Sequence, residues 1–134
     1  MCAAIYNLTN MYSEQLLDHF QNPRNGGELA DPDAAADIEN PACGDILRLT
    51  LKIESGRIAE IRFKAKGCVP SMACASALTE LVAGSTLEES RALKRDTLIA
   101  AVGGLPQAST HAAQLALDAL QAVLKQLQSA PLRP

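Results

Sequence analysis

The feature that most constrains the fold is a pair of alternating segments in the first half of the chain. Residues 46–54 (ILRLTLKIE) place apolar side chains at every second position, and residues 58–66 (IAEIRFKAK) repeat the pattern after the short connection SGR. A period of two predicts strands with one buried and one solvated face, and a short connection that contains Gly predicts a hairpin. The buried face of this hairpin needs a covering layer, which the remaining segments have to supply.

Helical signals lie on both sides of the hairpin. Ser13 is placed to cap a short helix that runs through Phe20. After the hairpin, Pro70 suits the first turn of a helix that runs to Gly84, where Gly provides a C-terminal stop. The chain therefore predicts at least one helix before the two strands and one directly after them.

Two further helices are predicted downstream. Ser85 and Glu88 have the spacing of a capping box, and the helix that they begin continues through RALKRDTLIAAV with a break near Asp96. Ser109 or Thr110 caps the last helix. The apolar residues of that helix recur at helical spacing and form one stripe: Ala113, Leu117, Leu120, Leu124 and Leu127.

This order of helix, hairpin and further helices predicts an α+β domain, a small antiparallel β-sheet with helices packed on one face. The chain has 134 residues, enough for one core, and 48% hydrophobic but only 3% aromatic residues make that core aliphatic and rich in alanine. We expect residues 1–10 to be an N-terminal extension before Met11, residues 11–130 to form the single domain, and residues 131–134 to be a tail.

Charge is spread unevenly along the chain. The net charge of −3 argues against a nucleic-acid partner. Residues 28–39 contain five acidic residues and no basic one, and we interpret residues 28–40 (ELADPDAAADIEN) as an irregular connection. Residues 48–66 contain six basic residues against two acidic ones, which we interpret as the solvated face of the sheet, with docking of an acidic protein as the alternative. No signal peptide or membrane-spanning apolar run is recognisable, so we expect a cytoplasmic protein with reduced thiols and no membrane partner.

Four groups that can bind a metal fall at the ends of the predicted elements. Cys43 and Asp45 precede the first strand, Cys68 follows the second, and His111 lies in the first turn of the last helix. A hairpin brings the start of its first strand beside the end of its second, and the last helix can add the imidazole. Two thiolates, a carboxylate and an imidazole suit a tetrahedral Zn²⁺ or Fe²⁺. The alternative is that Cys43 is a loop cysteine, Asp45 caps a turn, Cys68 is a small buried residue and His111 faces solvent.

Cys74 is a separate case. It shares a helix face with Ala77, Leu78 and Leu81, which is typical of a core position. We therefore predict a buried structural thiol, with an alternative reactive thiol as the second interpretation.

The segments YSEQLLDHFQNPRN, PACGDILRLTLKIESGRIAEIRFKAKGC and ASALTELVAGSTLEE closely resemble the U-type iron–sulfur cluster assembly scaffolds, the NifU N-terminal or IscU-like family. The likeness runs from about Met11 to about Leu127 and includes NPRN, ACGD and GC in the family's order. The resemblance implies a small antiparallel sheet with helices on one face. It also implies that the protein receives sulfur from a cysteine desulfurase, holds iron, Zn²⁺ or a nascent [2Fe–2S] cluster, and passes the cluster to acceptor apo-proteins.

The resemblance assigns residues one by one. Cys43 and Cys68 match the first two of the family's three cysteines, Asp45 matches its aspartate and His111 its histidine. Ala112 stands where the family has its third cysteine, the thiolate that accepts sulfur. The sequence LPQAST replaces the LPPVK-type segment that an Hsp70 chaperone recognises, so the resemblance does not carry that chaperone contact over to this chain.

These departures leave three hypotheses. The first is a scaffold or carrier for iron–sulfur assembly that acts by binding and transfer and has no turnover chemistry of its own. The second is a degenerate relative that binds a single Zn²⁺ structurally or serves as a partner-binding module. The third is a zinc-dependent sulfur acceptor. The sequence leaves open whether the protein forms a homo-oligomer.

Overall fold

A three-stranded antiparallel sheet forms one layer of the computed structural model, which describes residues 12–40 and 44–128. The strands are β1 (Ala34–Asn40), β2 (Asp45–Glu54) and β3 (Arg57–Lys66), in the order β1-β2-β3. The predicted hairpin is confirmed as β2 and β3. Its two connecting residues, Ser55 and Gly56, have positive φ values of 54° and 76°, as the tight turn between twisted strands requires.

The prediction of an irregular connection at residues 28–40 is wrong, because its second half forms the edge strand β1. Ala34, Ala36 and Ile38 lie opposite the inward-facing residues of β2, in the register Ala36↔Leu49. Asp37 and Glu39 are exposed. The small alanines and the acidic residues between them hid the alternation, since alanine carries little strand signal of its own.

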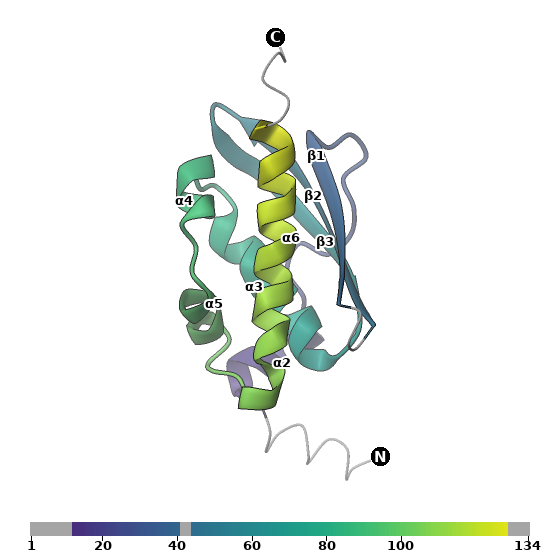
Figure 1. The fold of residues 1–134 in the computed structure, drawn as a ribbon, viewed down its shortest axis with the longest axis vertical. Helices are drawn as coiled ribbons and strands as arrows, with labels where there is room; N and C mark the ends of the chain where they lie inside the picture. The colour runs from purple at the N-terminus through teal and green to yellow at the C-terminus, as the bar shows by residue number, and fades with distance from the viewer. Residues whose placement is uncertain (1–11, 41–43, 129–134) are drawn as a thin grey trace.

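One helix precedes the strands and the other helices follow them, in the predicted order (Figure 1). Their bounds are α2 (Glu14–Gln21), α3 (Val69–Val82), α4 (Leu87–Arg91), α5 (Arg95–Ala101), the short 3₁₀ helix η1 (Gln107–Ser109) and α6 (Thr110–Gln128). Ser13 caps α2 by accepting a hydrogen bond from the Leu16 N–H at 2.9 Å, as predicted. Pro70 lies in the first turn of α3, also as predicted.

The predicted capping box is displaced by one residue. Thr86, with Glu89, forms it, and Ser85 with Glu88 does not. The helix that Thr86 caps, α4, ends at Arg91, earlier than the predicted break near Asp96. Leu93 then packs against the core, and Lys94 takes an extended conformation before α5 begins.

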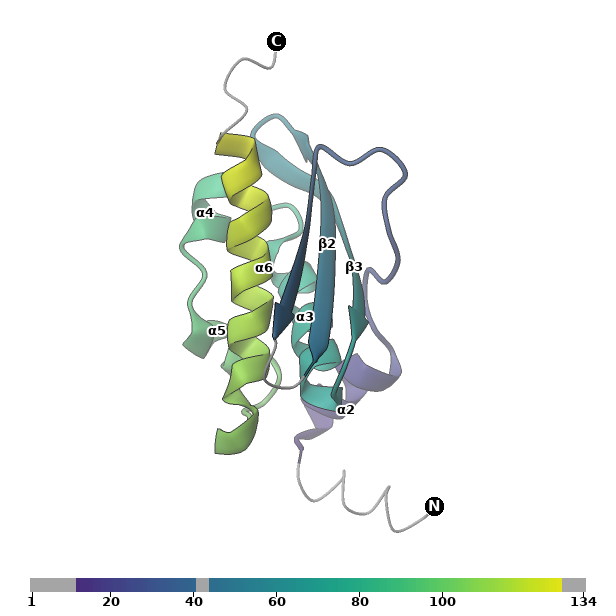
Figure 2. The ribbon, with the colours of Figure 1, turned by 45° about the vertical axis from the view of Figure 1, so that its right-hand side comes forward.

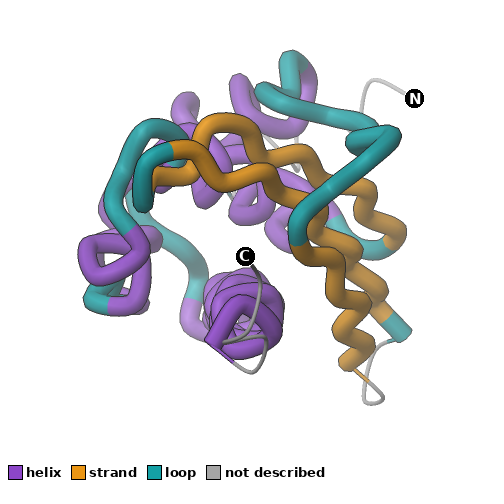
Figure 3. The backbone as a smooth tube through the Cα atoms, turned by 90° about the horizontal axis from the view of Figure 1, so that it is seen from above, coloured by secondary structure: helices purple, strands orange, loops and turns teal. Residues whose placement is uncertain are grey.

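The long helix α6 and helix α3 cover the inner face of the sheet (Figures 1 and 2). Seen from above, the strands form one curved layer with α6 on its concave side (Figure 3). The predicted stripe of α6 is confirmed, since Ala113, Leu117, Leu120 and Leu124 are buried and Leu127 is partly buried. The sheet therefore has helices on one face, as the sequence predicts.

The basic outer face of the sheet is only partly solvated. Arg48 forms ion pairs with Glu28 and Asp37, each at 3.0 Å, and the Leu29 N–H donates a hydrogen bond to the buried hydroxyl of Thr50. The acidic segment thus crosses the basic strands, and the uneven charge of the sequence becomes complementary charge in the fold. Lys64 and Lys66 stay exposed. No helix within the described ranges is long and apolar enough to cross a membrane.

Gln126 holds the C-terminal part of α6 against the sheet edge. Its side-chain amide accepts a hydrogen bond from the Ala35 N–H at 3.1 Å and donates one to the Ala35 carbonyl, as a neighbouring strand would.

We predict that Gln126→Leu lowers the free energy of unfolding by about 1 kcal/mol, the net value of one or two such exposed hydrogen bonds. Urea denaturation measures this. Gln114→Leu, the same exchange at an exposed residue whose amide donates to Asp118 of the same helix, is the control and should change stability by less than ~0.5 kcal/mol; equal effects would contradict the role of Gln126.

Candidate metal centre

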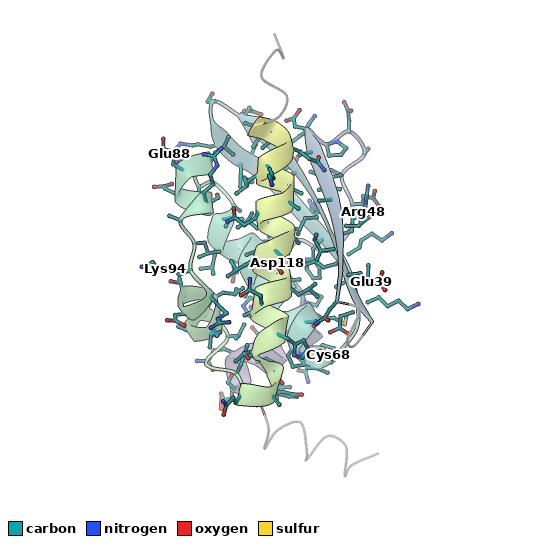
Figure 4. All side chains as sticks on the ribbon, in the orientation of Figure 1. Glu39, Arg48, Cys68, Glu88, Lys94 and Asp118 are labelled. Carbon is teal, nitrogen blue, oxygen red and sulfur yellow. The ribbon has the colours of Figure 1, made fainter. Side chains whose placement is uncertain are left out.

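Asp45, Cys68 and His111 meet at one end of the sheet. Asp45 opens β2, and the pairing of Ile46 with Lys66 brings the end of β3 beside it. Cys68 follows as the N-cap of α3, and His111 is the second residue of α6. Figure 4 shows Cys68 where the sheet ends beside the N-terminal half of α6. The hairpin and the last helix therefore bring together side chains that are 66 residues apart at most.

The three side chains are spaced as ligands of one ion would be. Cys68 Sγ lies 3.2 Å from Asp45 Oδ2 and 4.0 Å from His111 Nε2, and the Asp45 Oδ2 to His111 Nε2 distance is 3.8 Å. A tetrahedral Zn²⁺ or Fe²⁺ with bonds of ~2.0–2.3 Å separates its ligand atoms by about 3.3–3.8 Å. A sulfur, an oxygen and a nitrogen thus occupy three corners of a tetrahedron of nearly the right size.

Asp45 is the buried member of the group, with 3% of its surface exposed. Its Oδ1 accepts a hydrogen bond from the Cys68 backbone N–H at 3.2 Å. Its Oδ2 accepts one from the Ser71 hydroxyl at 2.6 Å and one from the Cys68 thiol. A buried carboxylate is costly unless donors surround it, and here the first turn of α3 supplies them.

His111 presents its Nε2 to the site. Its Nδ1 lies 3.2 Å from the Ala108 carbonyl oxygen, an acceptor only, so Nδ1 donates there and the neutral imidazole would have its lone pair on Nε2. The imidazole side chain is 37% exposed, which makes it the solvent-facing wall of the site. The short η1 segment before α6 provides this carbonyl, and the position of His111 in the first turn of α6 is as predicted.

Burial raises the pKa of the Cys68 thiol above its ordinary value. The hydrogen bonds of Ser71 act in the opposite direction, and the negative charge of Asp45 adds to the increase. Binding of a metal ion to Cys68 would displace the thiol proton.

The prediction of a buried structural Cys74 is confirmed. The side chain has no exposed surface, and burial raises the pKa of its thiol to about 12. A thiol that is protonated at neutral pH and sealed from solvent is a poor nucleophile, so the alternative of a reactive Cys74 has no support in the fold.

Cys43, the remaining predicted ligand, lies outside the described residues. Ala112, next to His111, is fully buried, and its methyl group offers no ligand atom.

Ser71 and Gly67 also belong to the site, a role that the sequence motifs did not indicate. Ser71 is one helical turn after Cys68, and a hydroxyl three residues after an N-cap on the same helix face is the only local signal for it. Gly67 packs so closely on Asp45 that an added Cβ would overlap the carboxylate. The glycine of the GC motif is therefore required by the neighbouring carboxylate, which no local pattern reveals.

The fold and this ligand set define a class of small α+β domains that carry metal-binding groups at the end of a hairpin. The sequence model described as "NifU-like N terminal domain" matches residues 11–133. The chain therefore belongs to the NifU-like N-terminal domain family.

Curated relatives and a solved structure agree with this assignment. The chain is 42% identical over 111 residues to the protein of Archaeoglobus fulgidus named iron-sulfur cluster assembly scaffold protein IscU 1, covering 83% of this chain and 72% of that protein. It is 42% identical over 118 residues to the IscU scaffold protein of Azotobacter vinelandii, covering 85% of this chain and 91% of that protein. The crystal structure of a NifU-like N-terminal protein from Brucella abortus superposes with a TM-score of 0.74 at 24% identity, covering 91% of this chain and 97% of that one, which shows the shared fold.

We predict that Gly67→Ala destabilises the protein. The added methyl group pushes the Asp45 carboxylate away from the Cys68 N–H, and the loss of a hydrogen bond to a buried charge costs roughly 1.5–3 kcal/mol. Gly26→Ala is the matched control, because nothing lies within 4 Å of a Cβ at that position. Chemical denaturation should show a lower unfolding free energy for Gly67→Ala alone; equal stability of the two variants would contradict the close contact.

Proposed function

We propose that the protein is an iron–sulfur cluster assembly scaffold that holds iron or a nascent [2Fe–2S] cluster as cargo and passes it to acceptor apo-proteins. The observation that carries the proposal is the convergence of Cys68 Sγ, Asp45 Oδ2 and His111 Nε2 at tetrahedral spacing. Membership of the NifU-like N-terminal domain family supports the same role. We propose Cys43, Asp45, Cys68 and His111 as the ligands, with Cys43 two residues before Asp45 in the sequence.

The arrangement suits cargo that has to enter and leave. Asp45 is buried on the inner side, whereas His111 is partly exposed on the outer side. A mixed set of sulfur, oxygen and nitrogen ligands also binds iron less firmly than four thiolates, because only thiolates match the softness of cluster iron well. A partner that approaches from the His111 side would reach the cargo without opening the core.

We further propose that a cysteine desulfurase supplies the sulfur. The terminal sulfur of the desulfurase persulfide would be attacked by the thiolate of Cys43 or Cys68, so that a new S–S bond forms, the old one breaks, and the desulfurase thiolate is released. Ala112 cannot take this role, because persulfide formation needs a nucleophilic sulfur.

A second candidate function is the binding of one Zn²⁺ without assembly of a cluster. The observation that favours it is Ala112, which is buried where the family resemblance places the third thiolate. With fewer thiolates, the ligand set still satisfies a single tetrahedral Zn²⁺.

Anaerobic reconstitution with Fe²⁺ and sulfide tests the scaffold function. We expect visible absorption and two bound irons per cluster, as [2Fe–2S] chemistry requires, and loss of both in Cys43→Ser and Cys68→Ser. Cys74→Ala is the control and should retain the absorption, because its thiol is sealed in the core. A colourless product that carries no iron, but one Zn²⁺ by native mass spectrometry, would contradict the scaffold function and support the second candidate.

Sulfur acceptance has its own test. After incubation of the protein with a cysteine desulfurase and cysteine, we expect mass spectrometry to find one additional sulfur atom on the peptide that contains Cys43 or Cys68, since these are the proposed acceptors. Iodoacetamide should trap the persulfide, and Cys74→Ala should behave as the unaltered chain does. Absence of added sulfur on every thiol would contradict transfer from the desulfurase.

A further inference from the structure

We propose that Ser71 is a positioning residue of the metal centre, which holds Asp45 as a ligand through a single oxygen and thereby sets how tightly the cargo is bound. This inference rests on the proposed function, because it concerns the same site. It starts from a hydroxyl that is buried, with 4% of its surface exposed, and that no part of the function proposed above uses.

The two oxygens of Asp45 have different surroundings. Oδ1 accepts the Cys68 N–H and lies against Gly67, so it faces the backbone between β3 and α3. Oδ2 faces Cys68 Sγ at 3.2 Å and His111 Nε2 at 3.8 Å. Only Oδ2 is therefore placed to join the sulfur and the nitrogen around one ion.

Ser71 donates to this same Oδ2, at 2.6 Å. A carboxylate oxygen has two lone pairs, so one can receive the hydroxyl hydrogen while the other binds a metal ion. The hydrogen bond then fixes the rotation of the carboxylate and the direction of the second lone pair. Groups that hydrogen-bond to metal ligands in this way typically contribute 10–100-fold to metal affinity.

The position of Ser71 distinguishes it from the other buried hydroxyls of α3. Its oxygen also lies 3.2 Å from Cys68 Sγ, so it contacts two of the proposed ligands at once. Ser76, on the same helix and also buried, lies instead beside His19 and accepts the Arg24 N–H. The loss of either hydroxyl removes a buried hydrogen bond, but only the loss of Ser71 changes the metal centre.

Co²⁺ alone, as an anaerobic probe, tests the inference. The unaltered chain, Ser71→Ala and Ser76→Ala are titrated in competition with a chromophoric chelator, and the sulfur-to-cobalt charge-transfer absorption is recorded. We expect Ser71→Ala to bind Co²⁺ about 10–100-fold more weakly while the charge-transfer band persists, because Cys68 still ligates. Ser76→Ala should keep the affinity of the unaltered chain, even if its stability falls.

A double-mutant cycle shows whether Ser71 acts through Asp45. In a chain that carries Asp45→Ala, adding Ser71→Ala should change the Co²⁺ affinity by less than about twofold, because the group that Ser71 orients is gone. A larger change would mean that Ser71 acts through its contact with Cys68, and it would overturn the role assigned through Asp45. An unchanged or tighter affinity of the single Ser71→Ala variant would overturn the inference, as would an equal loss in Ser76→Ala. If the unaltered chain binds no Co²⁺ and no iron, the proposed function fails; if it binds both and Ser71→Ala binds equally well, only the role of Ser71 fails.

Discussion

The carboxylate of Asp45 is the group on which the geometry of the site depends. Burying an ionised carboxylate costs several kcal/mol unless hydrogen-bond donors replace the lost water. Cys68 and Ser71 supply those donors from the first turn of α3, and among the described residues no buried side-chain polar atom is left without a partner. The start of β2 is thereby bound to the junction of β3 and α3. The same bonds that make the burial of Asp45 tolerable also aim one of its oxygens at Cys68 and His111, so structural and functional demands are met by one set of contacts.

Opposite charges also pair on the outer face of the sheet. Arg48 lies between Glu28 and Asp37, and the acidic segment that carries Glu28 crosses the strands and covers Thr50. Exposed ion pairs of this kind contribute only ~0–1 kcal/mol each, so they do little for stability. Their effect is to place the segment that leads into β1. β1 ends at Asn40, three residues before Cys43 in the sequence, so this placement also determines where the chain leaves the sheet edge ahead of Cys43.

Ala112 stands where the family resemblance places a third thiolate, so the proposed ligand set contains two sulfurs, one oxygen and one nitrogen. Oxygen and nitrogen ligands suit a single Fe²⁺ or Zn²⁺ well, whereas cluster iron prefers sulfur. The methyl group of Ala112 is buried in the core, and it offers no ligand atom to the site. Cargo on such a site would be held by fewer strong bonds. Its affinity would therefore depend more on the orientation of the one carboxylate ligand.

The sequence alone determined the hairpin, the buried stripe of α6 and the identity of the ligand candidates, because burial follows the period of the apolar residues and metal chemistry follows the side-chain type. It also implied that Asp45 and Cys68 adjoin, since the two ends of a hairpin meet. The approach of His111 depended on how α6 packs across the sheet, which no local pattern encodes. The edge strand β1, the roles of Gly67 and Ser71, and the choice of Oδ2 as the oxygen that faces the other ligands were decided only by the tertiary structure. Each of these depends on contacts between atoms that are distant in the chain, where spacing along the sequence carries no information about direction or distance.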